Sequence, residues 1–467
     1  MKNCPADFFK RRFWQLGKFC FVAAAAVSYF WLVPRTIYFD YNATTPLDAD
    51  VRAAMLPFLA EHWGNPSSVH HVGRRARVLL DDARDRAAKF LGAKPSEIIF
   101  TSGGTEANNL AIFGTARALK AQGKHLITST IEHHAGLHCF DYLEKHEGFS
   151  VTRLPVDSTG RVSVEDLKRA IRADTTFVSV MAANNEIGTI QPVAELGAVC
   201  QARKIIFHTD AVQWFGKEPF DSIGQFHADL VSVCAHKFHG PKGAGLLYIK
   251  SPLHPNPILF GGGHENERRA GTENLPAIIG LVAALEKFVK SPVFDREKLK
   301  PLTKKLAAAI EKIPGCNLVG GSNFRAAKIP SPRAASGDGT NTQSATVSTF
   351  VPPASLPTDL SPRDNSHGAE NSCGFELSLA NTVAFTVRGS DGIALMAGLD
   401  VEGICASSGS ACSAGSLEPS HVILALGMPD VANSLVRFSL GRDSTLAEVE
   451  FVGSVLPEII RRAQRAK

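Results

Sequence analysis

Residues 176–209 contain Thr-Phe-Val-Ser-Val-Met (176–181), Val-Ala-Glu-Leu-Gly-Ala-Val-Cys-Gln-Ala (193–202) and Ile-Ile-Phe-His-Thr (205–209). The first and last of these segments are short apolar runs typical of strands, and the middle one has the length and pattern of a helix. Apolar strands separated by helices indicate a largely parallel sheet that is covered on both faces. This stretch therefore predicts an α/β fold.

The same alternation extends in both directions from this unit. We expect further strands at 97–100, 125–129, 229–234 and 245–249, and helices at 74–91, 107–121 and 164–171. After Ala277 the pattern becomes helical, and we expect a helix at 296–313. It is followed by a strand at 381–387, a helix at 391–399, a strand at 403–407 and a closing helix at 446–463. Functional sites of such sheets lie at the carboxyl ends of the strands.

The 467 residues are enough for two or three domains. We expect an extension at 1–36, a large domain at 37–290 and a smaller C-terminal α+β domain at 291–467. Whether the first segment of the large domain packs with the small one stays open. Of the 49 residues at 326–374, 23 are Ser, Thr, Pro or Gly, too polar a mixture to form a core. This segment is therefore interpreted as a surface insertion or linker.

The charge of the chain argues against nucleic-acid binding. The net charge is +5, and residues 1–35 alone carry six basic side chains and one acid. The other residues sum to zero, so the body has no overall basic field for nucleic acid. The apolar content of 44% is ordinary for a globular protein.

The nine cysteines are scattered along the chain without a Cys-x-x-Cys pair. Structural zinc sites use closely spaced pairs, and disulfide frameworks belong to short secreted chains. A reducing, cytoplasmic location fits this pattern best.

An apolar run of 15 residues, 19–33, follows a basic cluster at the N-terminus. A membrane-spanning helix needs about 20 such residues, and no small-residue cleavage site follows the run. A terminal extension is the simpler interpretation, although a membrane anchor or a targeting role stays open.

Two polar side chains and one glycine-containing turn follow predicted strands. Lys237 lies in Ala-His-Lys-Phe-His-Gly-Pro-Lys-Gly (235–243), where burial would lower the pKa of its amine and favour a Schiff base with an aldehyde. Asp210 suits the protonated nitrogen of a pyridine ring. The turn in Phe-Thr-Ser-Gly-Gly-Thr-Glu-Ala-Asn-Asn (100–109), with Thr105, suits a phosphate. Taken singly, Lys237 is more readily a salt-bridged loop lysine, and Asp210 is equally a helix N-cap or a loop acid.

Seven stretches of the chain from Ile37 onward resemble the cysteine desulfurase family. This family is the NifS/IscS-like branch of the fold type I (class V aminotransferase-like) enzymes that use pyridoxal 5'-phosphate. The stretches are Asp-Tyr-Asn-Ala-Thr-Thr-Pro (40–46), Gly-Asn-Pro-Ser-Ser (64–68), Thr-Ser-Gly-Gly-Thr-Glu-Ala-Asn-Asn (101–109), Asn-Asn-Glu-Ile-Gly (184–188), His-Lys-Phe-His-Gly-Pro-Lys-Gly (236–243), Arg-Arg-Ala-Gly-Thr-Glu-Asn (268–274) and Ser-Gly-Ser-Ala-Cys (408–412). The resemblance implies a mostly parallel seven-stranded sheet with flanking helices.

The resemblance also implies a role for each matching residue. Lys237 would hold the coenzyme covalently, and His133 would stack on its ring and move protons. Asp210 would pair with the ring nitrogen, and the ring oxygen would contact Asn185 and Gln213. The phosphate would be surrounded by Gly104, Thr105 and His236.

Two further implications concern the phosphate. Thr272 would reach the phosphate of a neighbouring subunit, so a homodimer is expected. The family usually has serine three residues before the lysine, whereas this chain has Cys234. Because a thiol is a weak donor, the coenzyme is expected to be held less tightly there.

Cys412 lies in a loop of small residues and would be the nucleophile. By the resemblance, L-cysteine would lose its sulfur to Cys412 as a persulfide and leave as L-alanine, while Arg437 binds the substrate carboxylate. The sulfur would pass to an iron–sulfur scaffold or another acceptor protein, and Cys412 would then contact the nascent iron–sulfur cluster. Cys405 is expected to be a buried residue. Arg437 alone is equally a helix-cap or surface arginine.

Several alternatives stay open at this point. Selenocysteine lyases share the Tyr-Asn-Ala-Thr-Thr-Pro start, and an aminotransferase of the same fold would not need Cys412. A membrane-tethered sulfur-transfer adaptor with a degenerate site is a non-catalytic alternative. His133, His134 and His138 suggest a zinc site, but no carboxylate or cysteine pattern completes it.

Overall fold

The computed structural model describes residues 36–322, 377–409 and 418–465. The N-terminal apolar run, the whole Ser/Thr/Pro/Gly-rich segment and Cys412 lie outside these ranges. In the described part of the chain, no helix is both long and apolar enough to cross a membrane.

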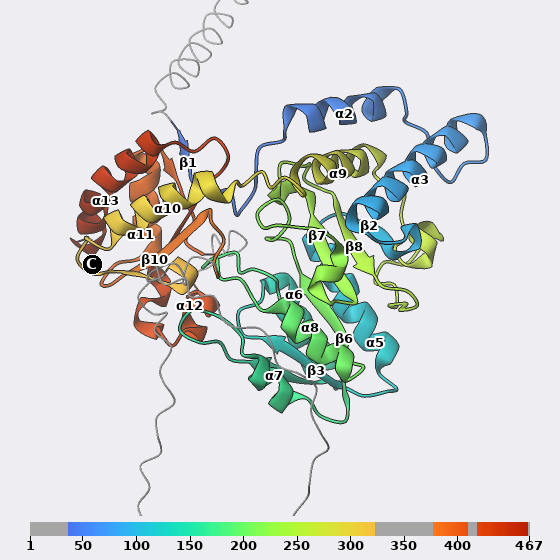
Figure 1. Ribbon diagram of the computed structural model, residues 1–467, viewed down its shortest axis with the longest axis horizontal. Helices are drawn as coiled ribbons and strands as arrows, with labels where there is room; N and C mark the ends of the chain where they lie inside the picture. The colour runs from blue at the N-terminus through green and yellow to red at the C-terminus, as the bar shows by residue number, and fades with distance from the viewer. Residues whose placement is uncertain (1–35, 323–376, 410–417, 466–467) are drawn as a thin grey trace, which may run out of the picture.

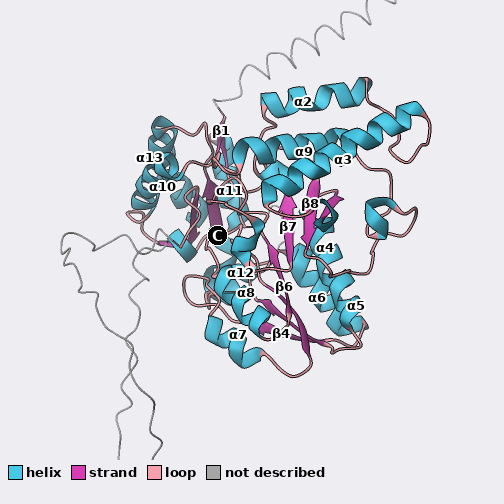
Figure 2. Cartoon of the chain, turned by 45° about the vertical axis from the view of Figure 1, so that its right-hand side comes forward, coloured by secondary structure: helices cyan, strands magenta, loops and turns pink. Residues whose placement is uncertain are grey.

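A seven-stranded sheet forms the centre of the larger part of the molecule (Figures 1 and 2). Its strand order is β2-β8-β7-β6-β5-β3-β4. Neighbours from β4 to β7 are parallel, and only β8 runs antiparallel to both of its neighbours. The mostly parallel seven-stranded sheet expected from the sequence is therefore confirmed. The strands are β2 (Ile98–Thr101), β3 (His125–Ser129), β4 (Ser150–Leu154), β5 (Thr175–Ser179), β6 (Ile206–Asp210), β7 (Leu230–Cys234) and β8 (Gly245–Ile249).

Helices cover both faces of this sheet, which explains why its strands are apolar on both sides. Adjacent residues Phe177 and Val178 of β5 belong to different hydrophobic clusters. The cluster with Val178 includes α3 (His71–Leu91), α7 (Val164–Ala170), α8 (Val193–Ala202) and α9 (Leu275–Phe288). The cluster with Phe177 includes α4 (Gly104–Asn109), α5 (Thr115–Leu119) and α6 (His134–His146).

Local sequence sets the bounds of these helices. In α3 the His70 side chain accepts a hydrogen bond from the Gly73 N–H, and Gly92 ends the helix with φ of 70°. Glycine adopts this left-handed conformation without strain. The single helix expected at 107–121 starts earlier, at Gly104. Between α4 and α5 it passes through a π-helical turn (Leu110–Gly114).

A second hydrophobic core lies beside the first and contains the C-terminal part of the chain (Figure 1). Its three-stranded sheet has the order β12-β10-β9, with antiparallel neighbours. Its elements are α10 (Arg296–Ile310), β9 (Cys316–Leu318), β10 (Thr382–Val387), α11 (Gly392–Val401), β12 (Leu435–Ser439) and α13 (Leu446–Arg465). Helix α2 (Ala49–Ala60) packs on α9 in the larger part, and α12 (His421–Ala425) lies between the two cores.

The first described residues pack with this second core. Strand β1 (Ile37–Tyr38) pairs in parallel with β11 (Ile404–Cys405), and the side chains of Ile37, Phe39 and Tyr41 lie in the second core. The chain then crosses to the large sheet, where the Thr45 N–H donates to the His236 carbonyl. Residues 39–45 therefore run between the two cores.

Candidate active site

A cavity opens where β6 and β7 end and residues 39–45 pass. Ten residues expected at the site line it, together with Asn42, Ala43, Asn108, Met181 and Val212. The ten are Gly104, Thr105, His133, Asn185, Asp210, Gln213, Cys234, His236, Lys237 and Arg437. Residues that span more than 330 positions of sequence are therefore brought to one place, as the carboxyl-end rule predicts.

Lys237 follows β7 in a single 3₁₀ turn. Its Nζ donates hydrogen bonds to the backbone carbonyls of Asn42 and Ala43, each at 2.8 Å. The amine is thus directed at the backbone of Asn42 and Ala43, which also line the cavity.

Asp210 is the last residue of β6 and is buried. One carboxylate oxygen accepts from Asn108 Nδ2 at 2.6 Å, and the other accepts from the Val212 N–H at 2.9 Å. These donors hold the carboxylate at the cavity wall.

His133 caps the N-terminus of α6, and its Nδ1 accepts from the Ala135 N–H at 3.0 Å. A ring nitrogen that accepts carries no hydrogen, so the neutral ring is protonated at Nε2. Burial lowers the pKa of His133, Asp210 opposes this effect and Lys237 adds to it.

The turn after β2 is closely packed against the strand end that carries Cys234. A Cβ on Gly104 would lie 2.8 Å from Val212 Cγ2 and 3.5 Å from Cys234 Cβ, so only glycine fits there. Gly103 has φ of 154°. Cys234 is buried, and its Sγ lies 3.9 Å from the Ala244 carbonyl oxygen, a weak contact for a thiol.

His236 lines the same end of the cavity. Its Nδ1 lies 3.1 Å from Thr44 Oγ1. Burial, followed by the charges of nearby lysines including Lys237, lowers the pKa of His236 to about 3. The ring is therefore neutral at physiological pH and acts as a hydrogen-bonding group rather than as a cation.

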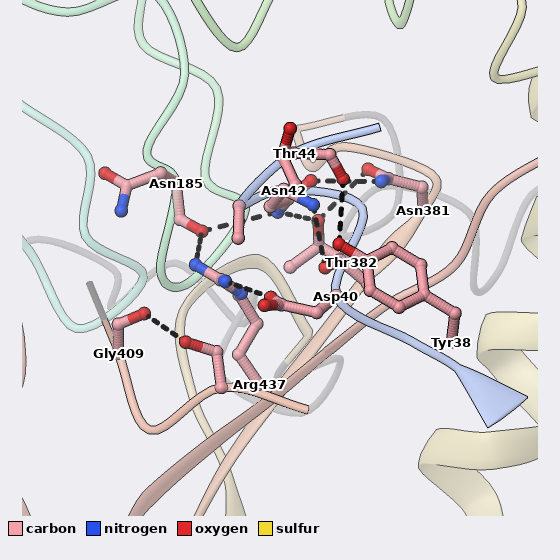
Figure 3. A network of polar contacts seen from close by, with 12 residues as sticks. Tyr38, Asp40, Asn42, Thr44, Asn185, Asn381, Thr382, Gly409 and Arg437 are labelled. Carbon is pink, nitrogen blue, oxygen red and sulfur yellow. Dashed lines mark hydrogen bonds and ion pairs between the residues drawn. The ribbon is translucent and has the colours of Figure 1, made fainter. Parts of the chain in front are cut away.

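Arg437 is on β12 with only 1% of its surface exposed, so the interpretation as a helix-cap or surface arginine is wrong. Its Nη1 donates to the Asn185 carbonyl at 2.8 Å, and its Nη2 donates to Asp40 Oδ1 at 2.6 Å (Figure 3). A guanidinium has five N–H groups. Arg437 Nε has no hydrogen-bond partner among the described residues.

Asn42, which lines the cavity, and Lys217, which lies behind it, received no role from the sequence. Asn42 bonds to several parts of the site, because its carbonyl accepts from Lys237 and from Gln213 Nε2, and its side chain contacts Asn381 and Thr382 (Figure 3). Lys217 is fully buried beside it. One sequence signal could have pointed to Lys217. It is the single lysine between Phe215 and Phe220, and it lies four residues after Gln213.

The chain leaves the described residues at Gly409 and returns at Glu418, with Cys412 between them. Both ends of this gap adjoin the buried Glu186. Ser420 Oγ donates to Glu186 Oε2 at 2.7 Å, and a Cβ on Gly409 would lie 3.2 Å from the same oxygen. Glu186 is the neighbour in sequence of Asn185, which lines the cavity.

Three other expectations can be compared with the structure. Thr272 is exposed and does not line the cavity of its own chain. His134 stacks with His138 at 5.0 Å between ring centroids, but no cluster of three or more potential metal ligands occurs among the described residues. Cys405 is half-buried rather than fully buried, and burial raises the pKa of its thiol.

Known proteins are similar to this chain over most of its length. The family model "Aminotransferase class-V" matches residues 37–336 and 366–452 and leaves out the middle of the Ser/Thr/Pro/Gly-rich segment. The chain is 41% identical over 429 residues to "Cysteine desulfurase IscS" from Dictyoglomus turgidum, covering 92% of this chain and 95% of that protein.

Solved structures are similar over nearly the same range. A "NIFS-LIKE PROTEIN" has a TM-score of 0.74 and 32% identity, covering 92% of this chain and all of the other. A structure described as "SspA in complex with cysteine" has a TM-score of 0.67 and 30% identity, covering 88% of this chain and all of the other.

Proposed function

The chain belongs to the class-V aminotransferase family as a pyridoxal-phosphate-dependent cysteine desulfurase, and from this premise we propose how its own residues carry the reaction. The enzyme converts L-cysteine to L-alanine and transfers the sulfur. Its curated relatives bear the name cysteine desulfurase, which favours this activity over a selenocysteine lyase or an aminotransferase.

The cavity residues fit the coenzyme chemically. Lys237 supplies an amine for the aldehyde, Asp210 a carboxylate for the ring nitrogen, and Gly104, Thr105 and His236 line the end of the cavity assigned to the phosphate. Asn185 and Gln213 are assigned to the ring oxygen, and Cys234 to the phosphate end. The bound coenzyme supplies an electron sink for the charge that develops at the substrate Cα.

Proton movement is assigned to Lys237 and His133. The Lys237 amine takes the proton from the substrate Cα, since it is held in the cavity by two carbonyl acceptors. His133 would stack on the coenzyme ring and move protons, and its neutral ring carries the proton at Nε2 because Nδ1 accepts from the Ala135 N–H.

Arg437 and Asn185 are assigned to substrate binding. Arg437 donates two N–H groups to Asn185 and Asp40 and keeps three for the substrate carboxylate. Because these two contacts already fix the guanidinium plane, little side-chain entropy is lost on binding.

Cys412 is assigned as the nucleophile. Its thiolate attacks the sulfur of the substrate, the carbon–sulfur bond breaks, and Cys412 becomes a persulfide while the carbon skeleton leaves as L-alanine. The persulfide then delivers sulfur to an iron–sulfur scaffold or another acceptor protein, and Cys412 contacts the nascent cluster. The support is the position of Gly409 and Ser420 on Glu186, the neighbour in sequence of the cavity residue Asn185.

A second copy of this chain is the proposed partner, with Thr272 reaching its coenzyme phosphate. The exposure of Thr272 supports this, as do several large apolar side chains exposed in the larger part of the molecule, which a monomer would leave in water. They include Leu59 at 63%, Trp63 at 71%, Val69 at 87% and Phe260 at 86% exposed. Light scattering with Phe260→Ser should show a weakened dimer.

The domain division and the location complete the proposal. Residues 37–290 form the coenzyme-binding domain and residues 291–467 the smaller one, with the first segment packed on the smaller core. A cytoplasmic location is supported by the five described cysteines, all of which are free thiols.

One observation carries the assignment, namely that Lys237, Asp210, His133 and Arg437 line one cavity. The test is incubation with L-cysteine, with alanine and sulfide measured together. Lys237→Ala should lose both turnover and the visible coenzyme absorbance. Cys412→Ala should keep the absorbance but release no sulfur, and the matched control Cys405→Ala should retain activity. Persulfide transfer that persists in Cys412→Ala would overturn the assignment of the nucleophile.

A further inference from the structure

We propose that Lys217 is a positioning residue that fixes the side-chain amide of Gln213 and so sets the hydrogen bond offered to the coenzyme ring oxygen. This inference rests on the proposed function, in which Gln213 contacts that oxygen. Lys217 itself does not line the cavity. It acts from behind the cavity wall, through residues that do line it.

Lys217 is 2% exposed, and its amine has two acceptors. Nζ donates to Asn42 Oδ1 at 2.7 Å and to Gln213 Oε1. Its Nζ also lies 5.2 Å from the centre of the Phe294 ring, within the range of a cation–π contact. A lysine in such surroundings is costly unless its hydrogen bonds are needed.

The neighbours of the Asn42 and Gln213 side-chain amides determine which way the oxygen of each amide points. Asn42 Oδ1 also accepts from Asn381 Nδ2 at 3.0 Å, and Asn42 Nδ2 donates to Thr382 Oγ1 at 2.9 Å. The oxygen of Asn42 therefore faces Lys217. The Asn42 backbone carbonyl, which can only accept, receives Gln213 Nε2 at 3.0 Å.

These contacts leave Gln213 a single orientation. Its oxygen faces a donor, Lys217, and its nitrogen faces an acceptor, the Asn42 carbonyl. The second N–H of the same nitrogen remains as the donor that Gln213 provides to the cavity it lines. Without Lys217 the oxygen loses its buried partner, and the amide is free to turn its acceptor toward the ring oxygen.

Burial and nearby charges, including that of the Lys237 amine, affect the pKa of Lys217. Burial lowers its pKa most, the nearby cations Lys237 and Arg437 lower it further, and Glu218 opposes them. Glu218 is itself paired with Arg296. Either protonation state of the amine has enough hydrogens for both acceptors, so the orientation of Gln213 does not depend on the charge of Lys217.

The experiment measures coenzyme affinity of the full chain by titrating the apoprotein with pyridoxal phosphate. Wild-type binding is measured first, and its absence would refute the proposed function rather than this inference. Lys217→Met should weaken binding about tenfold, the value of one lost hydrogen bond. Lys217→Gln keeps an N–H donor and should restore most of the affinity. The control Lys250→Met removes a half-exposed lysine and should change nothing.

Two comparisons separate positioning from a merely structural role. In a Gln213→Met background, Lys217→Met should cause no further loss, because its effect passes through Gln213. With the 3-deoxy analogue of the coenzyme, which lacks the ring oxygen, wild type and Lys217→Met should bind equally. Additive losses in the double variant, or a tenfold loss that persists with the analogue, would overturn the inference. If Lys217→Met does not fold, the Lys217→Gln variant is compared in the same two ways and should follow wild type.

Discussion

Replacing Glu265 by glutamine should destabilise the protein far more than the same change at Glu286. Each carboxylate accepts two hydrogen bonds from the guanidinium of an arginine in α3. Glu265 pairs in this way with Arg84, and Glu286 with Arg86. In the first pair 11% and 1% of the arginine and glutamate side chains are exposed, against 39% and 39% in the second. The two pairs thus differ mainly in burial.

The expected loss of stability follows from the buried donors that lose their carboxylate acceptor. Glu265 Oε2 also accepts from the Phe100 N–H at 2.9 Å, so glutamine would set an NH₂ group against one of several buried donors. Breaking a buried pair costs about 3–5 kcal/mol because the remaining charge is uncompensated. An exposed pair contributes about 0–1 kcal/mol. Glu265 also holds a left-handed backbone, φ of 49°, which the pair helps to maintain.

The assay is urea unfolding followed by circular dichroism. A double-mutant cycle that combines Glu265→Gln with Arg84→Met measures the coupling of the pair, which should exceed about 1 kcal/mol. Equal destabilisation by Glu265→Gln and Glu286→Gln would refute the reasoning, because burial would then have no effect on the cost.

Three further predictions concern other parts of the chain. Burial raises the pKa of Glu132 from 4.5 to about 8. The free energy of unfolding should therefore fall as the pH rises from 4.5 to 8, by up to about 1.4 kcal/mol per pH unit, because the unfolded chain loses this proton first. Glu132→Gln should flatten this dependence of the urea midpoint, and an unchanged slope would contradict the prediction. Cys234→Ser should tighten coenzyme binding in a titration because a hydroxyl is the better donor, and unaltered affinity would count against a role at the phosphate. Deleting residues 326–374 should leave the unfolding midpoint unchanged, since Gly321 and Ser378 are in contact on either side. An unfolded product would show that the segment is needed.

The strands of the large sheet were predictable because they are continuous apolar runs. Strands at 125–129 and 245–249 have the predicted bounds. Strand β4 was not predicted, because it is an edge strand and four of its five residues are only half-buried. Helix α6 was also missed. Its cap is His133 rather than one of the usual capping residues.

Site residues that end a strand were predictable, and those that depend on distant pairing were not. Asp210 and Lys237 follow recognisable strands, so the carboxyl-end rule applies to them. Asn42 reaches the site because Ile37 pairs with Ile404, a contact that no local pattern encodes. The burial of Arg437 likewise depends on the pairing of Ala384 with it in β10 and β12.

The crossing of residues 39–45 between the two cores links the active-site amine to the relative position of the two parts. Lys237 belongs to the large sheet, yet both of its carbonyl acceptors lie on a segment attached to the second core by the Tyr41–Ser439 and Asn42–Ser439 hydrogen bonds. A small rotation of one part against the other would therefore lengthen both hydrogen bonds of the amine at once. The amine and these two acceptors thus belong to different parts of the molecule, so the position of one part against the other sets the geometry at Lys237.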